Sequence, residues 1–170
     1  TFVVWGRYGI VRELPCDNIK HYIYDSGTNS QQNDASGDYS NNENGFLVLY
    51  PGDPRSKLKL WGNSLLECGD TLFIYNGDIT ENPDIVPYYT ITGPGSHQLG
   101  SEDDPVFMSA VPGQPITLRM QSDSSCTAAG FELQAKCCQT PGLPIGLHGN
   151  MTSDTSAFIN WIPGEGNDLI

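Results

Sequence analysis

Residues 65–78 of the chain read Leu65-Leu66-Glu67-Cys68-Gly69-Asp70-Thr71-Leu72-Phe73-Ile74-Tyr75-Asn76-Gly77-Asp78. The four residues before the Asn-Gly pair alternate, with Leu72 and Ile74 on one face and Phe73 and Tyr75 on the other. This alternation predicts a β-strand that ends at a tight turn. A cysteine flanked by two carboxylates stands just before the strand, so the stretch combines a strand signal with a candidate site.

A second acidic loop further along the chain also carries a cysteine. It reads Gln121-Ser122-Asp123-Ser124-Ser125-Cys126 and ends the alternating run 116–121. Two loops that each hold a carboxylate and a cysteine predict that a disulfide and a hard cation tie them together.

Composition and charge argue against several classes of protein. The 170 residues carry a net charge of −12 with a pI near 4.3, so nucleic-acid phosphates and anionic membrane surfaces would repel the chain. No run approaches the roughly 18 apolar residues that a membrane span needs, and the N-terminal residues do not form a signal peptide. Five cysteines in an acidic, loop-rich chain indicate an oxidising extracellular setting, either secreted or at a cell surface.

Short alternating apolar runs recur along the chain, separated by turns that use many of the 19 glycines and 12 prolines. No sustained helical period is present, so helices should be few. The pattern predicts an all-β fold, a two-sheet antiparallel β-sandwich, with a closed barrel as the structural alternative. The expected strands lie at residues 19–25, 45–50, 57–61, 71–75, 88–92, 106–111, 116–121 and 131–136.

The chain changes character near both of its ends. Residues 1–15 hold one apolar run and form either a lead-in segment or the tail of a preceding domain. Residues 16–138 form the main domain, and the Pro- and Gly-containing residues 139–144 resemble a linker. Residues 145–170 contain a new strand at 156–161 but are too few to close a core, which predicts the start of an incomplete second domain.

Several motifs in the main domain occur in the order of a CUB domain. They are Tyr24-Asp25-Ser26-Gly27, Gly37-Asp38-Tyr39-Ser40-Asn41-Asn42-Glu43, Asp70-Thr71-Leu72-Phe73-Ile74-Tyr75-Asn76-Gly77, Ser122-Asp123 and Gly130-Phe131. Within that family, the chain most resembles the form found in secreted and surface proteins of Bacteroidetes-type bacteria. The resemblance covers residues 16–138 and implies a jelly-roll-like sandwich.

The end of the chain resembles the first two strands of a fibronectin type III domain. This similarity rests on Gly142-Leu143-Pro144, Thr152, Ser156-Ala157 and Trp161, the last of which is expected in the core of such a domain. The two resemblances together imply modules of a multidomain extracellular protein.

The CUB resemblance also implies a calcium site in the loops at one end of the sandwich. Many CUB domains bind calcium through a Glu and two Asp residues, and Asp70 and Asp123 match the two Asp positions. Glu67 is the best match to the Glu, although the family's Glu stands further upstream of the first Asp. Calcium takes six to eight oxygen ligands, which suits carboxylates held together by a scaffold. The alternative is that these residues are solvated turn carboxylates.

The cysteines fit the same arrangement. A bridge between Cys68 and Cys126 would pin both acidic loops at the implied site. Cys16 begins the main domain and either Cys137 or Cys138 ends it, so a second bridge would close the whole sandwich. The odd number of cysteines leaves one thiol outside these two bridges.

No catalytic constellation stands out in the sequence. His21, His97 and His148 are far apart, and Ser96 lacks the flanking glycines of a nucleophile elbow. Phosphate-loop and dinucleotide-binding fingerprints are also missing. We therefore expect a protein that is not an enzyme.

The expected function is that of a non-catalytic extracellular binding or adhesion module. The resemblance implies that calcium holds a loop end whose acidic residues meet a basic group on a partner protein. The alternatives are a carbohydrate-binding accessory module, which would use the aromatic residues Trp61, Tyr88 and Tyr89, and a structural spacer. The partner is then a protein or a glycan, on a cell surface or in the parent assembly, with no nucleic acid and no membrane insertion.

Overall fold

The structure is a computed structural model that describes residues 2–4, 9–27, 37–139, 145–153 and 155–162. Its elements within these residues are all β-strands. They are β1 (Phe2–Val4), β2 (Ile10–Leu14), β3 (His21–Tyr24), β4 (Asn44–Pro51), β5 (Ser56–Leu66), β6 (Thr71–Tyr75), β7 (Tyr89–Thr92), β8 (Gly95–Leu99), β9 (Phe107–Met108), β10 (Ile116–Gln121), β11 (Gly130–Gln139), β12 (Ile145–Ser153) and β13 (Ser156–Ile162). The chain divides into two units, Thr1–Cys138 and Gln139–Ile170.

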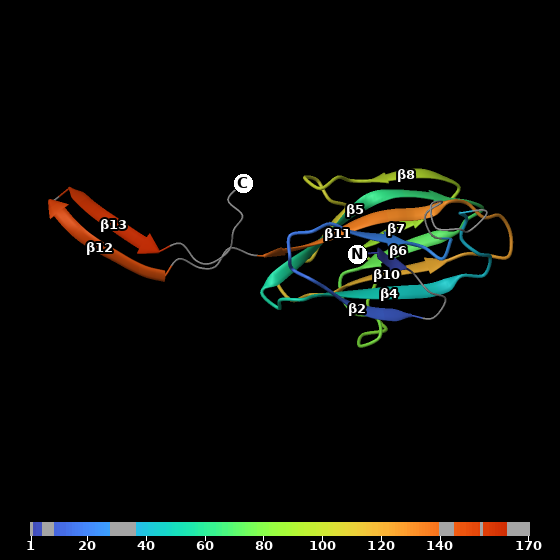
Figure 1. The fold of residues 1–170 in the computed structure, drawn as a ribbon, viewed down its shortest axis with the longest axis horizontal. Coiled ribbons are helices and arrows are strands. Elements are labelled where there is room, and N and C mark those ends of the chain that lie inside the picture. Colours follow the sequence, from blue (N-terminus) through green and yellow to red (C-terminus); the bar gives the residue numbers. More distant parts are fainter. Residues whose placement is uncertain (1, 5–8, 28–36, 140–144, 154, 163–170) are drawn as a thin grey trace. The chain divides into compact units, whose positions relative to one another are not determined.

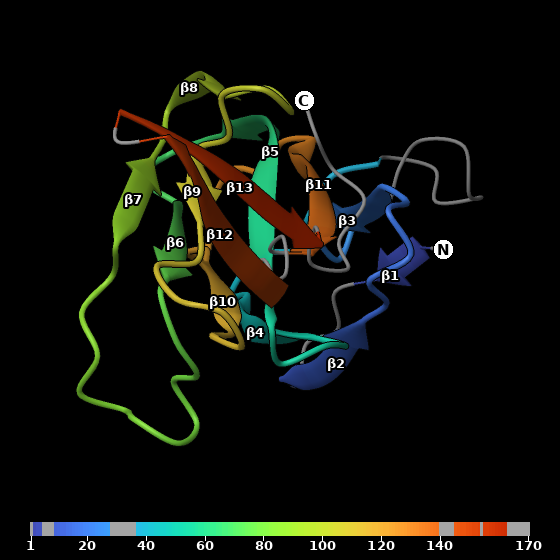
Figure 2. The ribbon, with the colours of Figure 1, turned by 90° about the vertical axis from the view of Figure 1, so that its left-hand side faces the viewer.

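The first unit is a sandwich of two sheets. In the part of the chain that the structure describes, one sheet has the strand order β1-β3-β11-β5-β8, with β9 also paired to β5, and the other has the order β2-β4-β10-β6-β7. In Figure 2 the strands β8, β5, β11, β3 and β1 follow one another from the top toward the right of the view, and β7, β6, β10, β4 and β2 from the left toward the bottom. The predicted all-β two-sheet sandwich is therefore confirmed.

The core lies between the two sheets. Alternate residues of β6 point inward, since Leu72 and Ile74 are fully buried whereas Phe73 is half-buried, as the sequence predicted. Inward-facing residues of both sheets join one apolar cluster, for example Leu133 of β11 and Leu118 of β10. Burial of this apolar surface is the main stabilising contribution to the fold.

The first fifteen residues were predicted to be either a lead-in segment or the tail of a preceding domain. Their described part adds an edge strand to each sheet, with β1 parallel to β3 and β2 parallel to β4. Figure 1 shows β2 beside β4. Leu14 is 1% exposed and belongs to the core. The described part of the lead-in segment therefore belongs to the sandwich, in the unit Thr1–Cys138. Parallel partners are distant in sequence, so a local alternation pattern does not reveal this pairing.

Strand β8 was also not predicted. It pairs antiparallel with β5, from Gly62↔Leu99 to Leu66↔Gly95, in a stretch whose sequence looks like a polar loop. Strand β5 is correspondingly longer than expected and includes the first two residues of the stretch 65–78.

The second unit contains an antiparallel hairpin of β12 and β13. The strand expected at residues 156–161 is present, and several apolar side chains of the hairpin are exposed, among them Leu147, Met151, Phe158 and Ile159. Residues 140–144 of the expected linker lie outside the residues that the structure describes, and so does the side chain of Trp161. Within the described residues, the structure contains no helix that is long and apolar enough to cross a membrane.

Candidate functional site

Three loops meet where β10 ends. Gln121, the last residue of β10, pairs with Asn44 at the start of β4 and with Thr71 at the start of β6. The segments that adjoin these positions carry five acidic or phenolic side chains, and a sixth, that of Asp25, follows β3 and accepts the N–H of Phe131 near the start of β11. We call this group the acidic end, and it consists of Asp25, Tyr39, Glu43, Glu67, Asp70 and Asp123.

A disulfide joins two loops of the acidic end. Cys68 and Cys126 are bonded, with their Cα atoms 5.9 Å apart. Both residues have positive φ angles, 48° and 58°, which single residues of a tight turn can adopt. The predicted bridge is confirmed, and it ties the loop that carries Asp70 to the loop that carries Asp123.

Asp70 is the centre of a hydrogen-bond network. Its side chain is buried, with Oδ1 accepting the backbone N–H of Asp123 at 2.8 Å and Oδ2 accepting the hydroxyl of Tyr39 at 2.5 Å. Its own N–H donates to the carbonyl of Glu67 at 2.9 Å. Through this one carboxylate, three segments that are far apart in sequence are held together.

The Tyr39 hydroxyl both donates and accepts a hydrogen bond. It donates to Asp70 and accepts the backbone N–H of Glu67 at 3.0 Å. Burial of the ring raises the pKa of Tyr39, and the hydrogen bond to Asp70 and the negative charges of Asp70 and Glu67 raise this pKa further. The hydroxyl therefore keeps its proton and remains a donor at physiological pH. Tyr39 belongs to one of the CUB-like motifs, and no role was predicted for it from the sequence.

Asp123 is exposed and caps its own loop. Its Oδ1 accepts the backbone N–H and the hydroxyl of Ser125, at 2.7 and 2.9 Å. Its carbonyl accepts the N–H of Asn42 at 2.7 Å, which is a further hydrogen bond between two loops of the acidic end. Glu67 is half-buried beside Tyr39. Asp123 and Glu67 are thus the two members of the predicted calcium set that solvent can reach.

The predicted calcium ligands come together only in part. Asp70 and Asp123 are joined by a hydrogen bond, and Glu67 contacts the same tyrosine as Asp70. Both oxygens of Asp70, however, already accept protein donors. Among the residues that the structure describes, no three metal-ligating side chains converge on one point. Calcium binding by Glu67, Asp70 and Asp123 therefore stays a prediction.

Two further carboxylates of the acidic end were not recognised from the sequence. Asp25 is 1% exposed and accepts the backbone N–H of Gly27 at 2.8 Å and that of Phe131 at 2.5 Å. Burial raises the pKa of Asp25 to about 7, and the charge of Glu43 contributes to this rise. Glu43 is 2% exposed, and neither of its carboxylate oxygens has a hydrogen-bond partner.

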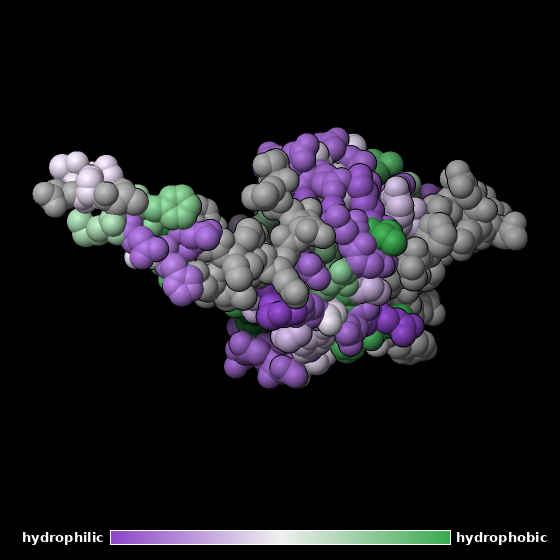
Figure 3. All heavy atoms as spheres, turned by 60° about the vertical axis from the view of Figure 1, so that its left-hand side comes forward, coloured by the Kyte–Doolittle hydropathy of each residue, from purple (hydrophilic) through white to green (hydrophobic). Residues whose placement is uncertain are grey.

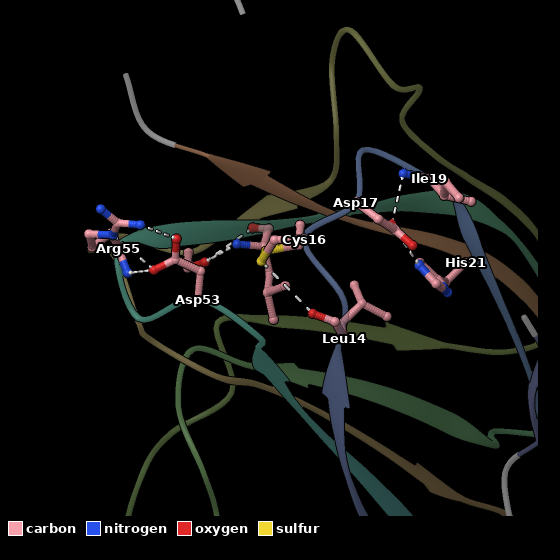
Figure 4. The surroundings of a disulfide bond; sticks show 10 residues. Leu14, Cys16, Asp17, Ile19, His21, Asp53 and Arg55 are labelled. Atoms are coloured by element: carbon pink, nitrogen blue, oxygen red, sulfur yellow. Dashed lines mark hydrogen bonds and ion pairs between the residues drawn. A yellow bond between two sulfur atoms is a disulfide. The ribbon is translucent and has the colours of Figure 1, made fainter. Parts of the chain in front are cut away.

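The second disulfide joins Cys16 to Cys137. Cys137 lies on the inward face of β11 and is 2% exposed, so it is this cysteine and not Cys138 that reaches Cys16. Figure 4 shows the surroundings of this bridge, where the Asp17 carboxylate accepts the N–H of Ile19. This bond is the largest contribution to lowering the pKa of Asp17. The prediction left the choice between the two adjacent cysteines open, and the direction of each side chain on the strand decides it.

The aromatic residues considered for sugar binding behave differently from one another. Trp61 is 4% exposed, and the ammonium groups of Lys20 and Lys59 lie 5.9 and 5.7 Å from its ring centroid. A sugar ring therefore has no access to Trp61. Tyr88 and Tyr89 are 62% and 42% exposed, and the ring of Tyr88 packs edge-on against Phe107 with centroids 5.1 Å apart.

The histidines occupy separate places. His21 is buried, with Nε2 3.5 Å from an Asp17 oxygen, and Figure 4 shows this contact beside the disulfide. His97 lies on β8, and His148 is exposed on β12. The three imidazoles therefore lie on three different strands.

A groove lies over the outer face of the second sheet. It has a volume of about 350 Å³ and is lined by Asn44, Phe46, Ile79, Thr80 and Arg119. The guanidinium of Arg119 donates two hydrogen bonds to Oδ1 of Asn44, so this charge is already engaged. In the view of Figure 3 the surface of the first unit is mostly hydrophilic, with separate apolar spots.

Comparison of the chain with models of known protein families and with curated proteins gives no match.

Proposed function

We propose that this chain is a non-catalytic binding module of a larger extracellular protein, and that its acidic end recognises a basic group on a partner protein. The observation that carries the proposal is the network in which Tyr39, Asp70 and Asp123 hold three loops together. The Cys68–Cys126 bridge adds a covalent link to the same loops. A surface that is ordered before binding loses less entropy when a partner binds.

Charge supports a basic partner. The chain has a net charge of −12, and the exposed Asp123 and the half-buried Glu67 lie at the rim of the acidic end. Complementary charge favours specificity and fast association. The two disulfides support an oxidising compartment, which agrees with a secreted or cell-surface location.

Calcium is the ion that the CUB resemblance implies for this end of the sandwich. Bound by Glu67, Asp70 and Asp123, it would offset the repulsion among their charges and hold the loops in one arrangement. Calcium would therefore stabilise the loops and would take no part in a reaction.

A lysine-based probe tests the recognition proposal. N-acetyl-lysine methylamide is titrated into the ¹⁵N-labelled chain, with calcium and with EDTA, and amide shifts are followed by NMR. We expect shifts centred on residues 122–126, weakened in Asp123→Asn and kept in the matched control Glu132→Gln, an exposed carboxylate on β11. Shifts that are the same in both variants would contradict a specific acidic site.

The exposed pair Tyr88 and Tyr89 favours carbohydrate binding as the second candidate function. Aromatic rings that stand open to solvent and are supported from behind, as Tyr88 is by Phe107, suit stacking on a sugar. Glycan-array binding that persists in EDTA and disappears in Tyr88→Ala would support this function. If the chain binds neither the lysine probe nor a glycan, the role of a structural spacer remains.

A further inference from the structure

The groove on the outer face of the second sheet combines one cation with apolar walls. It is lined by Asn44 and Phe46 of β4, by Arg119 of β10, and by Ile79 and Thr80 of the loop that follows β6. Its volume of about 350 Å³ lies in the range of about 300–1,000 Å³ that is typical of small-molecule sites. Arg119 stands directly opposite Phe46 in the ladder of β10 and β4, so the charge and an aromatic ring are neighbours. The groove therefore has the size and the mixed lining of a site for a small organic anion.

One edge of the Arg119 guanidinium is fixed by a neutral group. Its Nε and Nη2 atoms donate to Oδ1 of Asn44, at 3.2 and 2.9 Å, and Nε2 of Gln121 donates to the same oxygen at 3.3 Å. An amide carries no charge, so these bonds orient the guanidinium and leave its charge uncompensated. The ion pairs among the described residues involve other basic side chains. The edge formed by Nη1 and Nη2 offers two parallel N–H donors, and this fork matches the two oxygens of a carboxylate.

The opposite wall of the groove offers an acceptor. The hydroxyl of Thr80 donates to Oδ1 of Asp78 at 2.6 Å, so toward a ligand this oxygen can only accept a hydrogen bond. Asp78 also accepts the hydroxyl of Tyr50 at 2.7 Å, and the N–H of Ile79 donates to Oγ1 of Thr117 at 3.4 Å, which fastens the loop to the sheet. A ligand that fits both walls carries a carboxylate at the Arg119 end and a hydroxyl at the Thr80 end.

The position of the groove in the sheet disfavours a peptide ligand. Strand β4 lies between β2 and β10, and β10 lies between β4 and β6, so the backbone groups below the groove are used in the ladders. An extended peptide would need a free strand edge for backbone pairing. The half-buried Phe46 is held in place by the backbone at Gly9, where an added Cβ would lie 1.9 Å from Cζ of the ring. The apolar C–H face of a sugar ring suits stacking on such an aromatic side chain.

We propose that this groove binds a sugar residue that carries a carboxylate, of the uronic acid class. The carboxylate binds the open edge of Arg119, the sugar ring packs on Phe46, and a sugar hydroxyl donates to Thr80. The net charge of −12 opposes the approach of a long polyanion, so a single acidic sugar residue is preferred. The site goes beyond the proposed function, and it depends neither on the acidic end nor on Tyr88 and Tyr89.

NMR titration of the ¹⁵N-labelled full chain with three probes tests the site. Methyl glucuronide carries the sugar ring and the carboxylate, methyl glucoside lacks the carboxylate, and acetate lacks the sugar. We expect amide shifts centred on Asn44, Phe46 and Arg119 with the glucuronide, and binding of the other two probes that is weaker by about tenfold or more. Intermolecular NOEs between the Phe46 ring and the sugar C–H protons test the contact in wild type without any substitution.

Two arginine variants separate the fork from the charge. Arg119→Lys keeps the charge and loses the two parallel donors, so we expect affinity for methyl glucuronide to fall by about tenfold or more. Arg12→Lys makes the same change at an exposed arginine of β2 and should bind like wild type. EDTA and Tyr88→Ala should leave the affinity unchanged, because neither calcium nor Tyr88 belongs to this groove.

The outcomes separate this site from the other candidates. Equal affinity for acetate and methyl glucuronide would reduce the groove to a bare anion fork, and equal affinity for N-acetyl-glutamate methylamide would point to a peptide carboxylate. Either result would overturn the inference, and so would shifts confined to Tyr88 and Tyr89 or no shift in wild type. Glucuronide binding in a chain that ignores the lysine probe would refute the proposed function and support this inference.

Discussion

Replacement of Tyr39 by phenylalanine tests the network that holds the acidic end together. The ring stays and the hydroxyl is lost, so Asp70 Oδ2 loses a donor at 2.5 Å and the Glu67 N–H loses an acceptor at 3.0 Å. A hydrogen bond to a charged group contributes about 1.5–3 kcal/mol and a neutral one about 0.5–1.5 kcal/mol. We expect Tyr39→Phe to lower the free energy of unfolding by about 2–4 kcal/mol.

Urea unfolding followed by tryptophan fluorescence measures this loss. Tyr22→Phe is the matched control, because Tyr22 is half-buried on β3 and is stacked against Tyr24 with centroids 6.4 Å apart. The control should change stability by less than about 0.5 kcal/mol. A loss below about 0.5 kcal/mol in Tyr39→Phe would refute the argument that its hydroxyl joins the loops.

The same network predicts a loss of stability in alkali. The pKa of Tyr39 is higher in the folded chain than the usual value of about 10, since burial and the bond to Asp70 favour the neutral phenol. The contribution of this group is complete below about pH 10 and is lost as the pH rises through the folded pKa. Tyr39→Phe should flatten this alkaline decline, and a decline that is as steep in the variant would contradict the assignment.

Three further predictions concern other parts of the sandwich. In EDTA, carboxyl NMR should give Asp25 a pKa near 7. The stability of the chain should fall as the pH rises from about 4 through 7, because a carboxyl group whose pKa is raised by folding stabilises the folded chain only below that pKa. Glu43→Gln should lower the pKa of Asp25, and a pKa near 4 in wild type would contradict the burial argument. The double variant Cys68→Ala/Cys126→Ala should lose about 4 kcal/mol, as expected for a sequence separation of 58 residues, and an unchanged denaturation midpoint would contradict it. Trp61→Ala should lose about 3–5 kcal/mol, because the ring is buried, whereas a stable variant would show that the ring contributes little to packing.

The sandwich and the Cys68–Cys126 bridge were predictable because the strand alternation and the two loops with a carboxylate and a cysteine are short-range patterns, whereas the partner of Cys16 stayed open between Cys137 and Cys138. The alternation of Leu72 and Ile74 with Phe73 is a short-range pattern, and it fixes which face of β6 is buried. The cysteines beside Asp70 and Asp123 likewise indicated that two distant loops meet.

Other features depend on tertiary contacts that no local pattern contains. The parallel pairing of β2 with β4 and the polar edge strand β8 arise from partners far away in sequence. Tyr39 and Glu43 lie in an Asn- and Ser-rich segment that reads as a solvated loop, yet both are buried at the acidic end. Their burial follows from the bonds to Asp70 and Ser122, which become visible only once the sheets are assembled.

The most direct test of the calcium-stabilised acidic end is a thermal melt of wild type, Asp123→Asn and Glu132→Gln, each in EDTA and in 10 mM calcium. With a dissociation constant of about 10⁻⁴ M, calcium at about 100 times that value should add about 2.7 kcal/mol, which corresponds to several degrees. We predict this rise in wild type and in Glu132→Gln and a loss of most of it in Asp123→Asn. No rise in wild type, or an equal rise in Asp123→Asn, would contradict calcium binding by the Glu67, Asp70 and Asp123 set.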